Sequence, residues 1–247
     1  MSESKRVTVA FKNGKQLKLR IELLQEHHLD QAIEVLADLM AGYEPVSTNL
    51  GLGKDDWKEF ARLYCEKAAK ERSSHVAIRE TTGKVCSLTI AEDIKSNQPG
   101  MSQLSNPNWG RVLEFVDKVE EDAWPSEHWR KGKVWHHFLS GTHPDYRGAG
   151  INPRVNRENI AYAQKLGYEK VIVEATSVQN QTATKKLGFK VDHEAPYRHS
   201  QNNEGKYVFK EFDDSVHFSC QACSLPLAQD EILGPALCNC QFSTGEQ

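Results

Sequence analysis

A turn that contains two glycines is the feature that most constrains the fold of this chain. It comprises His143-Pro144-Asp145-Tyr146-Arg147-Gly148-Ala149-Gly150-Ile151-Asn152, between a strand-like run at 134–140 and a helical segment that begins near Pro153. Glycine lets the backbone turn tightly and approach a ligand closely. The unpaired N–H groups at the start of a helix favour an anion, typically a phosphate. Because Asn152 is a good N-cap residue and Pro153 suits the first helical position, we expect the helix to begin there.

The glycine spacing excludes the two most familiar nucleotide-binding loops. The chain has no Gly-x-x-x-x-Gly-Lys-Ser/Thr sequence, and no Gly-x-Gly-x-x-Gly follows an early strand. On its own, a glycine turn before a helix is only a modest indication of phosphate binding, because many such turns are purely structural. Further motifs are therefore needed to assign a function.

The composition indicates one globular domain. The chain has 247 residues, of which 38% are hydrophobic and 26% charged, and its net charge of −3 gives no basic surface for nucleic acid or anionic lipid. No run of about 18 apolar residues occurs, so no membrane span is expected. Residues 1–7 lack a secretory signal, and six cysteines in such a chain indicate reduced thiols. We therefore expect a cytoplasmic protein without a nucleic-acid or membrane partner.

The spacing of apolar residues predicts strands interleaved with helices, which is an α/β architecture. An Asn13-Gly14 pair predicts a hairpin turn near the N-terminus. Strands are expected at 7–11, 17–23, 74–79, 84–91, 133–142, 169–175, 189–192, 207–211 and 217–223. Helices are expected at 28–40, 54–70, 111–121, 154–166 and 180–187, and a polar loop at 93–108.

Four segments together resemble one enzyme superfamily. Arg147-x-x-Gly150-x-Asn152 is similar to the Arg/Gln-x-x-Gly-x-Gly/Ala signature of the GNAT acyltransferases, although Asn152 replaces the small residue. Leu187-Gly188-Phe189 is similar to the Leu-Gly-Phe element of the same superfamily. Glu44-Pro45-Val46 resembles the Glu-Pro-Leu segment of insect-type arylalkylamine (dopamine) N-acetyltransferases. The segment 106–115 resembles the helix that those enzymes insert between their third and fourth strands, and all four segments occur in the family's order.

The resemblance implies a fold and a co-substrate. The fold would be a GNAT domain at 1–225, with a mixed sheet of about seven strands flanked by helices, and a tail at 226–247. The co-substrate would be acetyl-CoA, with its pyrophosphate in the glycine turn and its pantetheine arm beside the strand before the turn. Arg147 would contact phosphate, or else be a surface arginine that stabilises the turn. The residues implied to bind the co-substrate are Ser140, Gly141, Thr142, Arg147, Gly148, Ala149, Gly150, Ile151, Asn152 and Asn180.

Acetylation of an amine requires its neutral form, so a base is needed. An alkylamine has a pKa of ~10.4, so deprotonation at neutral pH costs roughly 4–5 kcal/mol. The resemblance implies that Glu44 is this base. The alternative interpretation is a solvated carboxylate before Pro45. His136 and His137 are competing bases, but side chains alternate along a strand, so one of them must point away.

Other features leave alternatives open. The segment 177–184 has no tyrosine to protonate the thiolate, so we assign no general acid; Ser177, Asn180 and Thr182 are either proton donors or helix caps. An aromatic wall for an arylalkylamine could include Tyr43, Trp57, Trp109, Trp124, Trp129 and Tyr197, although Trp57 also fits a core position. Cys220-x-x-Cys223 with Cys238-x-Cys240 could bind zinc, but strand alternation would separate the first pair, and we expect no metal.

The sequence therefore predicts an acetyl-CoA-dependent N-acetyltransferase for primary arylalkylamines of the dopamine, tyramine, octopamine or serotonin type. The amine would attack the thioester directly in a ternary complex. The alternatives are a GNAT enzyme for a polyamine, an amino acid, a peptide lysine or another acyl-CoA, and a CoA-binding interaction module without turnover. The small-molecule amine is the one expected partner class, and the oligomeric state stays open.

Overall fold

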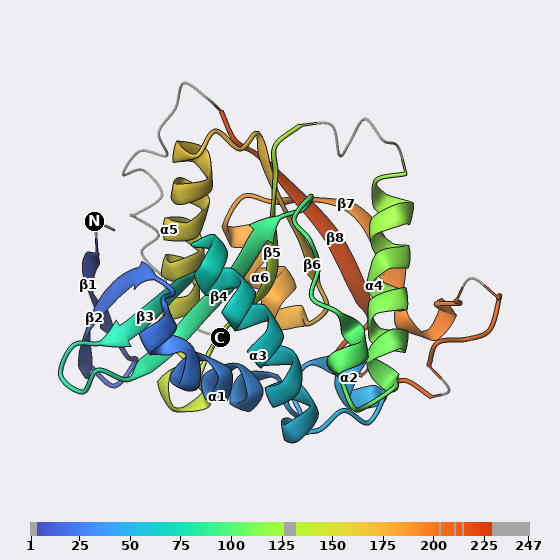
Figure 1. The fold of residues 1–247 in the computed structure, drawn as a ribbon, viewed down its shortest axis with the longest axis horizontal. Coiled ribbons are helices and arrows are strands. Elements are labelled where there is room, and N and C mark those ends of the chain that lie inside the picture. Colours follow the sequence, from blue (N-terminus) through green and yellow to red (C-terminus); the bar gives the residue numbers. More distant parts are fainter. Residues whose placement is uncertain (1–3, 126–131, 203, 210, 214, 229–247) are drawn as a thin grey trace, which may run out of the picture.

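The computed structural model describes residues 4–125, 132–202, 204–209, 211–213 and 215–228. These residues form one eight-stranded sheet in the order β1-β2-β3-β4-β5-β6-β8-β7, with helices on both faces (Figure 1). The strands are β1 (Lys5–Ala10), β2 (Gln16–Leu23), β3 (His75–Arg79), β4 (Val85–Asp93), β5 (Val134–Thr142), β6 (Lys170–Ala175), β7 (Lys190–Pro196) and β8 (Ser219–Pro226). The helices are α1 (Leu29–Met40), α2 (Pro45–Asn49), α3 (Lys54–Glu71), α4 (Asn108–Ala123), α5 (Ile151–Lys165) and α6 (Val178–Lys186).

The sheet confirms the predicted mixed α/β class. Every pair of neighbouring strands is antiparallel except β5 and β6, which are parallel. The described residues form eight strands, one fewer than the nine predicted from the apolar pattern and one more than the roughly seven that the resemblance implies. The inserted helix α4 follows the fourth strand of this chain, not the third, because the β1–β2 hairpin places two strands before α1.

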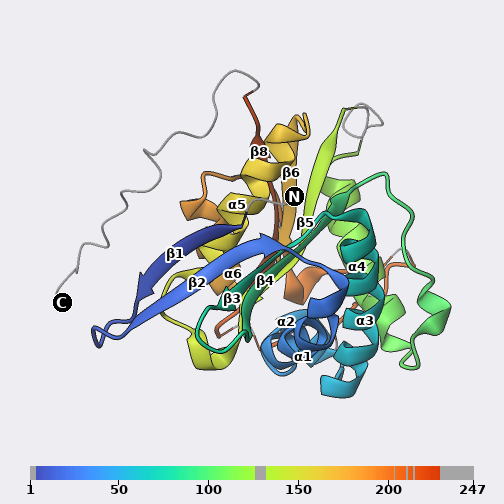
Figure 2. The same cartoon turned by 60° about the vertical axis from the view of Figure 1, so that its left-hand side comes forward.

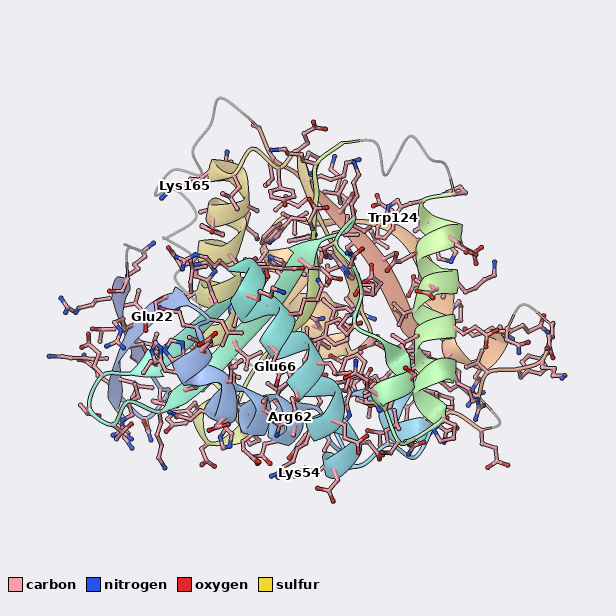
Figure 3. The ribbon with its side chains drawn as sticks, viewed as in Figure 1. Glu22, Lys54, Arg62, Glu66, Trp124 and Lys165 are labelled. Carbon is pink, nitrogen blue, oxygen red and sulfur yellow. The ribbon has the colours of Figure 1, made fainter. Side chains whose placement is uncertain are left out.

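Two helical layers cover the sheet (Figure 2). On one face α1, α3 and α4 pack around buried side chains such as Leu36, Phe60 and Ile90. On the other face α5 packs its Val155 and Ile160 against the strands. The outer side of α3 carries charged side chains, among them Lys54, Arg62 and Glu66 (Figure 3). The amphipathic pattern predicted for this helix is therefore present.

The strand expected at 207–211 is wrong. Tyr207 makes only an isolated bridge to Gln201, and no strand is found in the described part of this segment. Its apolar residues Val208 and Phe209 are 5% and 4% exposed and pack into the core formed with α4. The apolar residues that suggested a strand at 207–211 are therefore buried in an irregular segment.

Two further elements differ from the prediction. The polar loop ends at Asn108, where α4 begins three residues earlier than expected, since the Asn106 side chain accepts a hydrogen bond from the Asn108 N–H at 3.0 Å. The short helix α2 directly after Glu44 has too few residues to show an apolar period. Of the helices in the described ranges, none is long and apolar enough to cross a bilayer.

Candidate active site

The parallel strands β5 and β6 separate along their length. They pair only through Val134–Lys170, Trp135–Val171 and His136–Ile172. β5 also has a bulge directly after the last residue that pairs with β6. Leu139 pairs with Ile90 of β4 and His137 pairs with the next residue, Ala91, so the residue between them in β5 has no partner. Such a bulge bends its strand and re-aims side chains. The second half of β5 therefore diverges from β6.

A cavity of about 530 Å³ lies where the two strands diverge. Its volume falls within the range of small-molecule sites. One part of its wall is formed by the end of β5, the glycine turn and the first residues of α5 and α6. The rest is formed by the α1–α2 connection, α3 and α4. The predicted site residues in its wall are Glu44, Ser140, Gly141, Thr142, Arg147, Gly148, Gly150, Ile151, Asn152 and Asn180.

The glycine turn has the backbone conformation that its glycines were expected to provide. Gly148 and Gly150 have φ values of +85° and +64°, in the left-handed region that other residues avoid. Gly150 is the N-cap of α5, so the unpaired N–H groups of the first helical turn begin at Ile151 beside the cavity. This is the arrangement that favours an anion.

The prediction that Asn152 caps the helix is wrong. The helix begins at Ile151, so Asn152 and Pro153 lie within its first turn. The Asn152 amide instead donates to the carbonyl of Leu88 at 3.5 Å and accepts from the side chain of Asn156 at 3.3 Å. The Asn152 side chain, which replaces the small residue of the GNAT signature, is therefore hydrogen-bonded within the protein to Leu88 and Asn156.

Two other residues of the turn differ in their surroundings. Ala149 is 7% exposed and belongs to the core beneath the turn, so it does not line the cavity. The Arg147 guanidinium lies 4.1 Å from the ring centre of Tyr43, which comes from the α1–α2 connection. This cation–π contact joins the two sides of the cavity.

The end of β5 presents its backbone to the cavity. Gly141 pairs with Leu88 of β4, and its carbonyl accepts a hydrogen bond from the Ser87 hydroxyl at 2.6 Å. A side chain at Gly141 would meet the Leu39 methyl group at 2.9 Å. A larger residue here would therefore displace the Leu39 side chain of α1.

Glu44 begins the short helix α2 and lines the cavity. Its two carboxylate oxygens accept hydrogen bonds from the N–H groups of Val46 at 3.2 Å and Ser47 at 2.7 Å. The Ser47 hydroxyl also accepts from the Trp57 indole at 3.2 Å, which ties α2 to α3. Glu44 is thus a half-buried, oriented carboxylate and not a freely solvated one. Each oxygen keeps a second lone pair for another hydrogen.

The two histidines of β5 point to opposite faces of the sheet, as the alternation predicts. His137 is on the α5 side, and burial lowers its pKa to about 3. His136 is on the other side, between Glu92 and Glu174, with Nδ1 3.3 Å from one carboxylate and Nε2 2.7 Å from the other. Neither histidine lines the cavity, although Glu174 does.

Aromatic rings form much of the remaining wall. Of the predicted residues, Tyr43, Trp57 and Trp109 line the cavity, whereas Trp124 and Tyr197 do not and Trp129 lies outside the described residues. Sequence reasoning missed Phe60 and Phe138, which also line it. Phe60 lies three positions after Trp57 on the same helical face, a spacing that could have identified it. Its ring stacks on Trp109 with centres 4.1 Å apart.

Of the three polar residues considered as proton donors, Ser177 caps α6, whereas Asn180 and Thr182 lie within the helix. The Ser177 hydroxyl accepts a hydrogen bond from the Asn180 N–H at 3.2 Å, and the Thr182 hydroxyl donates to the Val178 carbonyl at 2.8 Å. Ser177 and Asn180 line the cavity, whereas Thr182 does not. The capping alternative is confirmed for Ser177 only, and no general acid is assigned.

The cysteine pair of β8 cannot act as one metal clamp. Cys220 packs in the core between the sheet and α4, whereas Cys223 packs in the core on the α5 side. The predicted separation by strand alternation is therefore confirmed. Cys238 and Cys240 lie outside the described residues.

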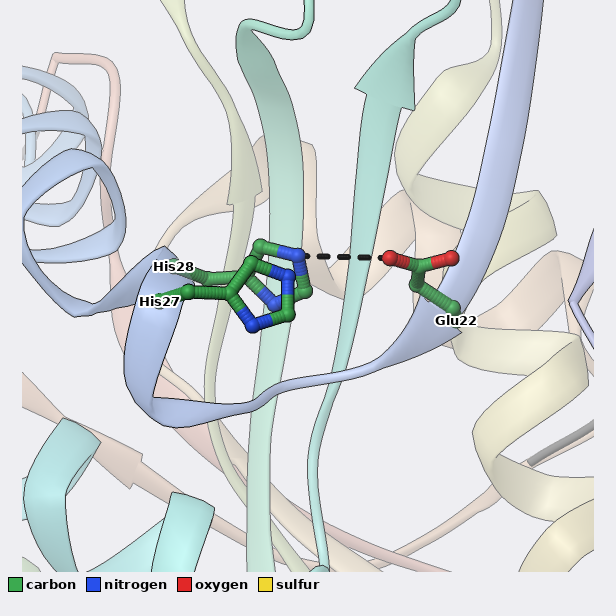
Figure 4. Close-up of side chains that lie close together, drawn as sticks. All are labelled: Glu22, His27 and His28. Carbon is green, nitrogen blue, oxygen red and sulfur yellow. Dashed lines mark ion pairs between the residues drawn. The ribbon is translucent and has the colours of Figure 1, made fainter. Parts of the chain in front are cut away.

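A second cluster of possible metal ligands, Glu22, His27 and His28, lies near the start of α1 (Figure 4). Both ring nitrogens of His28 are engaged, because Nδ1 accepts from the Gln25 N–H at 3.2 Å and Nε2 lies 3.2 Å from a Glu22 oxygen. Arg20 also bonds Glu22. Because burial lowers the pKa of His28, we interpret its contact with Glu22 as a hydrogen bond from the neutral imidazole to Glu22 that fixes the start of the helix.

The comparisons with known proteins define the fold. No protein-family profile and no curated protein sequence matches this chain. Among solved structures, the mosquito arylalkylamine N-acetyltransferase like 5b is similar with a TM-score of 0.71 and 21% identity, over 85% of this chain and 100% of the other. A polyamine N-acetyltransferase of Drosophila melanogaster is similar with a TM-score of 0.64 and 19% identity, over 85% and 100%.

A third similar structure is the arylalkylamine N-acetyltransferase 2 of Aedes aegypti, with a TM-score of 0.69 and 14% identity, over 85% of this chain and 99% of the other. The fold is therefore that of the GNAT acyltransferases, as the sequence motifs predict. Within that fold, this chain resembles the insect arylalkylamine N-acetyltransferases.

Proposed function

We propose that the protein is an acetyl-CoA-dependent N-acetyltransferase that acts on primary arylalkylamines. The observation that carries the proposal is that one cavity joins two kinds of wall. One is the glycine turn with the start of α5, which suits a pyrophosphate. The other holds Glu44 among aromatic rings, which suits an amine attached to an aryl group.

The first part of the cavity would hold the co-substrate. Backbone N–H groups at the start of α5 and the Arg147 guanidinium would bind phosphate oxygens. Ser140, Gly141 and Thr142 line the cavity on the strand that diverges from β6, so their backbone groups are placed to pair with an extended arm. The contact with the Tyr43 ring uses the face of the guanidinium, so its N–H groups stay available for a phosphate.

The proposed reaction is direct acetyl transfer in a ternary complex. Glu44 takes one proton from the ammonium group, and the nitrogen lone pair then forms a bond to the thioester carbonyl carbon. The carbon–sulfur bond breaks, and the CoA thiolate takes up the second proton that the nitrogen loses. The products are the N-acetylamine and CoA. Holding both substrates in one cavity supplies much of the rate, because the step becomes effectively unimolecular.

The aromatic wall favours an arylalkylamine over a polyamine. Phe60, Trp109 and Phe138 offer flat apolar surfaces to a ring. The second candidate is a polyamine or agmatine-type acceptor. A specific observation favours it too, because the cavity wall contains a second carboxylate, Glu174, which could bind a second cation.

The experiment that tests the proposal is a thiol-release assay with acetyl-CoA and a panel of amines. The panel contains tyramine, dopamine, serotonin, spermidine, agmatine and a lysine peptide. Faster turnover of the three arylalkylamines is expected. Turnover of spermidine, agmatine or the peptide alone would show that the acceptor is not an arylalkylamine. CoA binding without any turnover would indicate an interaction module.

A further inference from the structure

Glu174 is a deeply buried carboxylate that the proposed reaction does not use. It lies on β6, two residues beyond Ile172, the last residue of this strand that pairs with β5. It lines the cavity, and its side chain is only 4% exposed. A buried charge of this kind needs hydrogen-bond donors around it.

The two oxygens of Glu174 have different surroundings. Oε2 accepts a hydrogen bond from His136 Nε2 at 2.7 Å. Oε1 is buried as well, but it has no hydrogen-bond partner among the described residues. Buried hydrogen-bond acceptors are rarely left without a donor, because burial removes their hydrogen bonds to water and nothing replaces them. A donor from outside the chain would satisfy Oε1.

His136 holds Glu174 in place. Burial acts to lower the pKa of His136. The charge of Glu174 and the hydrogen bonds to Glu174 and Glu92 outweigh this effect and hold that pKa well above its ordinary value. Glu92 is bonded in turn to Lys67 and Gln98. With both ring nitrogens engaged, the imidazolium has no lone pair for a metal ion, although Glu120 lies close by.

Glu174 and Glu44 line the same cavity from different elements, β6 and the residue before α2. Glu44 begins α2, which is joined to the start of α4 by a hydrogen bond from the Asn108 amide to the Leu50 carbonyl at 2.8 Å (Figure 1). At the other end of α4, ligand atoms of Glu120 and Glu174 lie within 4.8 Å of each other.

Aromatic side chains line the space between the two carboxylates. Trp109 and Val116 of α4 lie in this wall, together with Phe60 of α3 and Phe138 of β5. The Phe138 ring is 5.4 Å from the His136 ring that holds Glu174. A ligand that carries an amine at one end, an aromatic ring in the middle and a hydrogen-bond donor at the other end would match the two carboxylates and the aromatic side chains of this wall.

We propose that Glu174 accepts a hydrogen bond from a ring hydroxyl of the substrate and so selects hydroxylated arylalkylamines. This inference rests on the proposed function. The amine would lie at Glu44 and the phenol at Glu174, where its O–H would satisfy Oε1. A site built to bind a hydroxyl rejects an analogue without one, because the buried acceptor is then left unpaired.

The test compares tyramine with phenethylamine, which differ only in the para hydroxyl. In the wild-type protein we expect kcat/KM to favour tyramine by about 10- to 100-fold, the range for a hydrogen bond to a charged group. In Glu174→Gln the amide oxygen would face His136, which leaves the NH₂ group toward the cavity. Because this NH₂ group can only donate a neutral hydrogen bond to the phenol oxygen, the variant should have a lower ratio of kcat/KM for tyramine to kcat/KM for phenethylamine than the wild type.

Glu92→Gln is the matched control, because Glu92 contacts the same imidazolium from the other side and does not line the cavity. It should keep the preference for tyramine. Thermal unfolding and CoA affinity by calorimetry establish that each variant is folded and binds its co-substrate.

Three results would overturn the inference. Equal losses on both amines in Glu174→Gln would place Glu174 at the amine or in the fold only. A loss confined to agmatine would assign it to a second ammonium group. Wild-type turnover without a preference for tyramine would remove this role and leave the proposed function, whereas no turnover of any amine would remove both.

Discussion

Glu44 combines a structural contact with a position in the cavity wall. Its carboxylate caps α2 through the N–H groups of Val46 and Ser47, and the same side chain faces the aromatic wall. The cap fixes the orientation of the carboxylate, which a base needs in order to reach an amine. A substitution at Glu44 should therefore change both stability and activity, and the two effects have to be separated.

Glu44→Ala should lower kcat/KM for tyramine by about 10²–10⁴-fold at neutral pH, the usual contribution of a general base. The loss should shrink as the pH approaches the pKa of the amine, because less of the substrate then needs deprotonation. Removal of the cap should also cost about 0.5–2 kcal/mol of stability. Steady-state kinetics from pH 6 to 10 and urea unfolding measure the two effects.

Asp56→Ala is a matched control for this experiment. The Asp56 carboxylate accepts a hydrogen bond from the Gly53 N–H at 2.7 Å at the start of α3, and it does not line the cavity. This variant should lose comparable stability and keep its activity. If both variants had the same kinetics, Glu44 would be a cap and not the base.

Single residues also mark what the sequence could and could not predict. Glu44 was predicted by motif, and its place in the cavity agrees. Glu174 was missed because a lone glutamate after the apolar run Val171-Ile172-Val173 carries no spacing of its own. A charge at the end of a buried strand is nevertheless a signal, since burial requires a partner. That partner, His136, is 38 positions away and is brought close only by the parallel pairing of β5 and β6.

At the scale of elements, the strand–turn–helix unit was well predicted from local chemistry. The position of the glycines and the Leu-Gly-Phe segment indicate where the turns lie. The exact start of α5 was not predicted, because a left-handed Gly150 can cap a helix as well as Asn152 can. The β5–β6 divergence depends on contacts distant in sequence, and no local pattern indicates it.

Gly150→Ala tests the turn as a phosphate site. Alanine at φ +64° is strained by about 1–2 kcal/mol, and relief of the strain should move the N–H groups at the start of α5. We expect a loss of stability together with weaker CoA binding, by about tenfold or more, measured by calorimetry. The loss of one hydrogen bond to a charged phosphate would account for a change of this size.

Gly83→Ala provides the comparison, because Gly83 has a φ of +68° in the β3–β4 turn and does not line the cavity. It should lose similar stability and bind CoA like the wild type. Unchanged CoA affinity in Gly150→Ala would show that the turn does not bind the co-substrate.

At the scale of the whole molecule, two buried histidines contribute to the response to acid. Burial lowers the pKa of His137 to about 3 and that of His75 to about 4. The unfolded chain takes up protons near pH 6.5 that the folded protein does not. The stability from these groups is thus present above pH 6.5 and is lost as the pH falls toward 4 and 3.

His137→Met should reduce this acid sensitivity. With one fewer proton taken up on unfolding, the slope of unfolding free energy against pH between 6 and 4 should fall by about 1.4 kcal/mol per pH unit. Urea unfolding at several pH values measures the slope. A slope equal to that of the wild type would mean that His137 titrates normally in the folded protein.

The described cysteines should be unreactive in the folded protein. Burial raises the pKa of Cys65 and Cys223 to about 12 and that of Cys86 to about 11, and it also raises the pKa of Cys220. Since the thiolate is the nucleophile, iodoacetamide at pH 8 should label these four residues only after unfolding. Mass spectrometry of native and urea-treated protein checks this, and rapid native labelling would contradict the described burial.

The central claim is that the glycine turn and the Glu44 end belong to one acetyl-transfer site. The most direct test is the affinity of a conjugate in which the tyramine nitrogen is joined through an acetyl bridge to the sulfur of CoA. If both ends share one cavity, calorimetry should show that the conjugate binds at least about 100-fold more tightly than CoA, because the second contact is then intramolecular. A conjugate that binds no more tightly than CoA would contradict the claim.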